Sequence, residues 1–97
     1  VLSLWEPEAQ SLTVVASVGF TPVQLEALRG IREGGGACRR AALGGRRVVV
    51  ADVETDSGFA PHRALARQLG FRAVHSTPVM SRTGACIGVL AVHFAAP

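Results

Sequence analysis

The stretch FRAVHSTPVMSRTGACIGVLAVHF, residues 71–94, decides the fold. It contains two runs rich in apolar and β-branched residues, 72–80 and 86–94, and the polar segment 81–85 lies between them. Two such runs around a short polar turn that contains a glycine are typical of a β-hairpin. The sequence therefore predicts that these residues form the central strand pair of a sheet.

The register of this hairpin decides where its two histidines lie. If the turn pairs Met80 with Cys86, His75 faces Ala91 and His93 faces Ala73. The two histidines are then diagonal neighbours on one face, about 7–8 Å apart at the backbone. The two histidines, together with Thr77, could then bind one ligand. No cysteine or carboxylate is placed to complete a set of four metal ligands, so we predict no metal site.

The remaining chain divides into shorter segments. Thr21 is a suitable N-cap, with Pro22 at the first helical position, and glycines end the helical segments. The expected elements are strands at 1–5 and 12–18 joined by a turn at 6–10, a helix from Pro22 to the glycines 34–36, a short helix at 37–43, a strand at 46–51, a loop at 52–57 and a helix at 61–69. Hairpins at both ends with helices between them favour an α+β fold, in which an antiparallel sheet has its helices on one side.

Composition limits the class of protein. The chain has 97 residues, enough for one domain, and 48% of them are hydrophobic. We expect residues 1–97 to be a single domain excerpted from a longer protein. No apolar run reaches the roughly 18 to 20 residues that a membrane span needs. With only two cysteines and no signal-peptide pattern, the sequence predicts a cytoplasmic location without a disulfide framework.

The basic residues do not indicate a nucleic-acid partner. The net charge is only +3, and all ten basic residues are arginines, scattered along the chain in singles and pairs. Nucleic-acid binding usually needs a basic stripe with stacking aromatic residues, and no aromatic residue here lies in a basic run. We therefore expect neither nucleic acid nor a membrane among the partners.

Candidate chemistry is sparse. The glycines 34–36 resemble a phosphate-binding loop, but the chain has no lysine to complete one, so a connection between helices is the preferred interpretation. Cys38 would begin a helix beside two arginines, a setting that favours a reactive thiolate, although a buried inert cysteine is more frequent. Asp52, Glu54 and Asp56 lack the glycine and closing glutamate of a calcium loop. No nucleophile, base and acid assemble, so we predict no catalytic residue.

An ordered set of segments resembles the GAF domains of bacterial, especially actinobacterial, sensor proteins. The set comprises residues 36–41, residues 45–53, Asp56 with Phe59, residues 70–79, Gly84 and residues 87–90. The resemblance implies a GAF-like (PAS-like) antiparallel sheet of about five strands, with short helices on one face that enclose a small-molecule pocket. In the family, terminal helices cover the other face, and these flanking helices are missing from the 97 residues.

The resemblance also implies a function. We expect a non-catalytic sensory domain that binds an unidentified small molecule, forms a homodimer and passes signals to an attached histidine kinase or transcriptional regulator. No cofactor can be named. The pocket candidates are polar residues placed near an enclosed sheet face: Cys38, Asp52, His62, Arg72, His75, Ser76 and Thr77.

An alternative stays open on Cys38. It could make the domain a thiol-based redox sensor, or an enzyme similar to the GAF domains that reduce free methionine sulfoxide. Those enzymes need a further cysteine after the third strand, and residues 52–70 contain none.

Overall fold

The computed structural model describes residues 1–33 and 36–97, and for residues 30–33 it describes the backbone alone. The glycine-rich connection expected at residues 34–36 therefore lies outside the described residues at positions 34 and 35. The elements are β1 (Leu2–Glu6), β2 (Ser11–Ala16), α1 (Pro22–Glu33), α2 (Ala37–Gly44), β3 (Val48–Val50), the 3₁₀ helix η1 (Ser57–His62), α3 (Arg63–Leu69), β4 (Ala73–Met80) and β5 (Cys86–Phe94).

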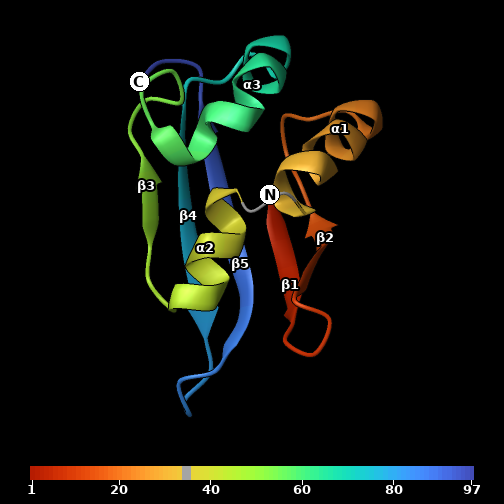
Figure 1. Ribbon diagram of the computed structural model, residues 1–97. Coiled ribbons are helices and arrows are strands. Elements are labelled where there is room, and N and C mark those ends of the chain that lie inside the picture. Colours follow the sequence, from red (N-terminus) through yellow and green to blue (C-terminus); the bar gives the residue numbers. More distant parts are fainter. Residues whose placement is uncertain (34–35) are drawn as a thin grey trace.

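The five strands form one antiparallel sheet in the order β2-β1-β5-β4-β3. Figure 1 shows α2 lying across the face of β4 and β5, with α1 and α3 near one end of the sheet. The predicted α+β fold, with an antiparallel sheet of five strands and short helices, is therefore confirmed.

Local signals in the sequence explain where the helices begin and end. The hydroxyl of Thr21 accepts a hydrogen bond from the Gln24 backbone N–H, and the Gln24 side chain accepts one from the Thr21 N–H. This reciprocal capping box confirms the predicted start of α1. Helices α2 and α3 end at Gly45 and Gly70, both left-handed with φ of 65° and 84°. Glycine adopts this conformation without a steric penalty.

The predicted register of the central hairpin is wrong. Met80 pairs with Cys86 as expected, but Val79 pairs with Gly88, so that Ile87 is an extra residue in β5. Such a β-bulge shifts every later pair by one position, and a shift by one residue moves side chains to the other face. His75 now pairs with Val92, and His93 no longer shares its face.

The core lies between the sheet and the helices. Its main cluster joins side chains of the sheet, of the helices and of the loops between them. The members are fully or almost fully buried: Leu28, Ala37, Val50, Val53, Phe59, Ala66, Phe71, Val74 and Ala91. A smaller cluster of Ala41, Ala42 and Val89 seats α2 on β5. The small side chains along α2 let this helix lie close to the sheet.

The opposite face of the sheet is apolar and exposed. Large hydrophobic side chains of the four strands β1, β3, β4 and β5 point to this face and are 39–52% exposed: Leu4, Val49, Val79, Ile87, Leu90, Val92 and Phe94. We call this set the outer face. Among the residues that the structure describes, no helix is long and apolar enough to cross a membrane.

Candidate functional site

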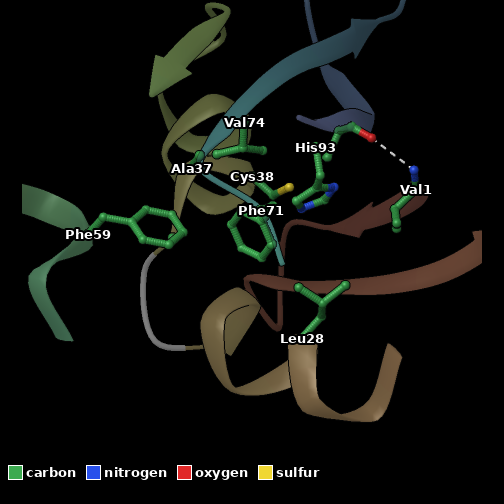
Figure 2. Close-up of a pocket in the computed structure, with 10 residues that line it drawn as sticks. Val1, Leu28, Ala37, Cys38, Phe59, Phe71, Val74 and His93 are labelled. Carbon is green, nitrogen blue, oxygen red and sulfur yellow. Dashed lines mark hydrogen bonds between the residues drawn. The ribbon is translucent and has the colours of Figure 1, made fainter. Parts of the chain in front are cut away.

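A small cavity of about 30 Å³ lies inside the domain, between the sheet and the helices. Figure 2 shows its lining, which comes from β1, α1, the start of α2, η1 and the two central strands. Most lining residues are apolar, and His93 and Cys38 supply the polar side chains. A space of this size holds one or two water molecules, so a larger ligand needs the walls to move.

The walls are positioned by local hydrogen bonds. Leu28 comes from α1, whose start is capped by Thr21. Phe59 is held because the Asp56 carboxylate accepts a hydrogen bond from its backbone N–H at 3.2 Å, which caps η1. Phe71 follows the left-handed Gly70, and its N–H donates to the Ala66 carbonyl oxygen. The apolar lining therefore belongs to short elements that turn toward the sheet.

His93 is the most unusual polar group of the cavity. Its ring makes edge contacts with Phe71 and Phe20, at centroid distances of 4.8 and 5.1 Å. Burial lowers the pKa of His93 from 6.5 to about 4. The imidazole is consequently neutral at pH 7, and it can donate one hydrogen bond and accept another.

Cys38 and Ser76 meet at the cavity wall. The Cys38 sulfur lies 3.4 Å from the Ser76 hydroxyl oxygen, and Ser76 is fully buried. Cys38 belongs to the first turn of α2, and Ser76 lies on the inner face of β4. Of the seven predicted pocket residues, Cys38 is the one that lines the cavity, and Ser76 is its direct neighbour.

Asp52 and Arg72 pair with each other. The Arg72 guanidinium donates to both carboxylate oxygens of Asp52, at 3.0–3.2 Å, and this pairing lowers the pKa of Asp52 below its ordinary 3.8. A second bidentate pair joins Arg67 to Glu54 and lowers the pKa of Glu54 in the same way. The first pair ties the loop after β3 to the start of β4, and the second ties the same loop to α3. Neither lines the cavity.

The other three predicted pocket residues lie apart from the cavity. His75 lies on the outer side of the sheet, where its ring contacts Phe94 and its Nδ1 lies 2.8 Å from the Arg47 guanidinium. Thr77 is exposed and pairs with Leu90 of the outer face. His62 is half-buried behind Phe59, at a centroid distance of 5.7 Å.

His93 and the aromatic walls were not among the predicted pocket residues. The position of His93 depends on the bulge at Ile87, because without it His93 would share a face with His75. Gly88 was the available signal, since a glycine inside a strand often accompanies a bulge or a close backbone approach. Within residues 1–33 and 36–97, no group of three or more histidine, cysteine, aspartate or glutamate side chains could hold a metal ion.

Comparisons with known proteins agree with this architecture. Among solved structures, a domain assigned to a two-component sensor histidine kinase from Sinorhizobium meliloti 1021 superposes with a TM-score of 0.70 at 17% identity, over 99% of this chain and 59% of that chain. The free methionine-R-sulfoxide reductase of Neisseria meningitidis, solved with its substrate, gives a TM-score of 0.61 at 22% identity, over 98% of this chain and 50% of that one. The chain thus spans about half to three fifths of these structures. None of the curated proteins matches it.

The fold defines the class, a small α+β domain in which short helices lie on one side of an antiparallel five-stranded sheet. The family model of the GAF domain matches residues 2–97. The chain belongs to the GAF domain family, as its ordered segments predicted.

Proposed function

We propose that this chain is the non-catalytic sensory domain of a bacterial signalling protein and that it binds a small molecule in its inner cavity. The attached output would be a histidine kinase or a transcriptional regulator, working in the cytoplasm. The domain would act through a change in its own conformation or association when the ligand binds. No chemical step is assigned to it.

The cavity carries this proposal. It lies where α1, η1 and the start of α2 meet the sheet, so a ligand there contacts the helices and the sheet at once. Ligand pockets are mostly apolar with a few placed polar groups, and the cavity offers His93 and Cys38 within an apolar lining. Because it is small when empty, binding must displace a wall, and this displacement is a signal that a neighbouring domain could read.

The outer face supports association as a second part of the proposal. Seven large apolar side chains are substantially exposed there. A contiguous apolar patch of this kind marks an interaction surface more often than it marks free surface. We therefore propose a homodimer that buries the outer face.

The alternative, a thiol-based redox sensor or reductase, has less support. Cys38 reaches the cavity, but its partner there is the hydroxyl of Ser76. Cys86 lies at the start of β5, where its thiol faces the Gly88 carbonyl oxygen at 3.3 Å. The likeness to the methionine sulfoxide reductase is a likeness of fold, at 22% identity.

A matched pair of variants tests ligand binding. Val74→Ile adds a methyl group to the cavity wall, and Val79→Ile adds the same group to the outer face of the same hairpin. Nucleotides, amino acids and haem are then screened by thermal unfolding. A ligand at 100 times its Kd stabilises by about 2.7 kcal/mol, a shift of several degrees.

A cavity ligand stabilises the wild type and Val79→Ile but loses affinity for Val74→Ile, because the added methyl competes for its space. Equal stabilisation of both variants would place the ligand elsewhere. A screen in which no compound stabilises the wild type would favour a spacer without a ligand.

A further inference from the structure

A second hollow adjoins the inner cavity. It is an open groove of about 410 Å³, between the end of β2 and the end of β5. Its lining residues are Val1, Leu2, Ala16, Ser17, Val18, Phe20, Leu90, Ala91, Val92 and His93. Three of them, Val1, Ala91 and His93, also line the inner cavity. These three residues therefore border both spaces.

Of the three, His93 has the side chain that can move aside. The backbone nitrogen of Val1 donates to the Ala91 carbonyl oxygen at 2.8 Å, and the Ala91 N–H donates to the Val1 carbonyl oxygen at 2.8 Å. These bonds fix the backbone of both residues, and the Ala91 side chain is only a methyl group. The imidazole of His93 is held by ring contacts instead, and a rotation about its side-chain torsions would join the cavity to the groove.

The lining indicates the charge of the occupant. Among the described residues, no aspartate, glutamate or arginine lines either space. The backbone nitrogen of Val1 lies there and already donates to the Ala91 carbonyl oxygen. His93 is neutral at pH 7, as its lowered pKa requires. Burying an ion without an opposite charge costs several kcal/mol, so the lining suits an uncharged molecule.

The rings beside His93 indicate the shape of the occupant. Phe20 on the groove side and Phe71 on the cavity side contact the imidazole at 5.1 and 4.8 Å, with interplanar angles of 85° and 71°. The imidazole is thus a flat ring inserted between two phenyl groups. When it rotates, it leaves a slot bounded by aromatic groups, which a second flat ring fits with the same edge contacts. The groove alone already has the volume of common ligand pockets.

We propose that the cavity and the groove form one ligand site, that His93 is the movable partition between them, and that the ligand is a neutral, flat aromatic compound with one polar group that hydrogen-bonds to the His93 imidazole. This inference rests on the proposed function, because it names the ligand class and the entry route of the same cavity.

Indole is a suitable probe, since it is neutral and flat and has one N–H donor. Indole-3-carboxylate is its anionic counterpart. Both are titrated at pH 7 into protein with ¹⁵N-labelled histidine, and the ring signals of His93 and His75 are followed by NMR. His93→Phe removes the hydrogen bond and keeps an aromatic ring. His75→Phe makes the same exchange on the outer side of the sheet, and it is the matched control.

Indole is expected to shift the His93 ring signals and leave those of His75 in place. His93→Phe weakens indole binding roughly five- to ten-fold, the usual effect of one hydrogen bond, and His75→Phe leaves it unchanged. Indole-3-carboxylate binds at least about ten-fold more weakly, because it would bury a charge. Equal or tighter binding of the carboxylate overturns the ligand class. An unaltered His93 signal at saturating indole overturns the site.

The His93→Ala variant tests whether the His93 side chain separates the cavity from the groove. This variant leaves an open connection of the size of an imidazole ring, and added imidazole is expected to raise its melting temperature while the wild type is unaffected. No stabilisation of a folded His93→Ala protein would contradict the partition. Should the Val74→Ile pair reveal a cavity ligand of another chemistry while indole does not bind, the proposed function stands and this inference fails.

Discussion

The sulfur of Cys38 lies 3.4 Å from the hydroxyl oxygen of Ser76, and this contact joins the first turn of α2 to the inner face of β4. Ser76 is fully buried, so its hydroxyl needs a partner inside the protein. The thiol supplies that partner at the point where the cavity begins. A reagent must therefore enter the cavity wall before it can attack Cys38.

We predict that Cys38 reacts slowly in the folded protein. In a Cys86→Ser background, alkylation of Cys38 by iodoacetamide at pH 7.5 should be at least roughly ten-fold slower than in the urea-unfolded chain, because access limits the reaction. Intact mass spectrometry follows the rate. Rapid alkylation of the folded protein would contradict the prediction and favour the redox alternative. A cavity ligand should slow the reaction further.

His93 predicts a loss of stability in mild acid. Its pKa falls from 6.5 in the unfolded chain to about 4 in the folded one, so the unfolded state binds more protons between these values. The contribution of neutral His93 to the free energy of unfolding is complete above about pH 6.5 and is lost as the pH falls toward 4. The full loss is about 3 kcal/mol, since a pKa difference of one between the folded and unfolded states corresponds to about 1.36 kcal/mol. Urea unfolding at pH 7, 5.5 and 4 measures it.

Two variants separate this effect from the carboxylates. Asp52 and Glu54 have lowered pKa values, so their contribution is present above their ordinary values and is lost as the pH falls below about 4. His93→Phe should be nearly insensitive to pH between 6.5 and 4.5, whereas His75→Phe should keep the wild-type slope. An unchanged slope in His93→Phe would show that another group carries the titration.

The parts of the fold that follow from local rules could be predicted from the sequence. The capping box of Thr21 with Gln24 marks the start of α1, and the left-handed Gly45 and Gly70 end α2 and α3. These signals act within four residues, so they can be read from a single chain. The predicted strand at 86–94 agrees with β5, because a continuous run of β-branched and apolar residues is also a local signal.

The site was harder to predict because it depends on one residue of register. The bulge at Ile87 turns His93 inward and leaves His75 outside, and no periodic pattern in the hairpin shows where the extra residue lies. The Asp52–Arg72 pair was not predicted, for a different reason. Both residues were predicted to line the pocket, but their contact spans 20 positions, and sequence spacing does not reveal which charges find each other.

Gly88 predicts a steric limit at the bulge. A Cβ atom at this position would lie 2.6 Å from the backbone carbonyl oxygen of Ser3, in the neighbouring strand β1. Backbone in a paired strand cannot retreat easily, so Gly88→Ala should destabilise the domain by about 2 kcal/mol or more. Gly44→Ala is the control, because nothing lies within 4 Å of its Cβ position in α2. It should be neutral or stabilise by up to about 1 kcal/mol. Equal effects of the two changes on urea unfolding would refute the steric limit.

Leu90 offers the sharpest test of association through the outer face. It is 45% exposed and pairs with both Leu2 and Thr77, so it lies between two neighbouring strands near the middle of the sheet. Leu90→Lys places a charge where the proposed dimer would bury it, and a buried unpaired charge costs several kcal/mol. Sedimentation velocity at 10–100 µM, a range set by the roughly micromolar affinities of moderate interfaces, should show a dimer for the wild type and a monomer for this variant. Leu43→Lys, at a 54% exposed position of α2 on the opposite side, should remain dimeric. A wild type that is monomeric throughout, or a Leu90→Lys protein that dimerises as the wild type does, would exclude the outer face as the interface.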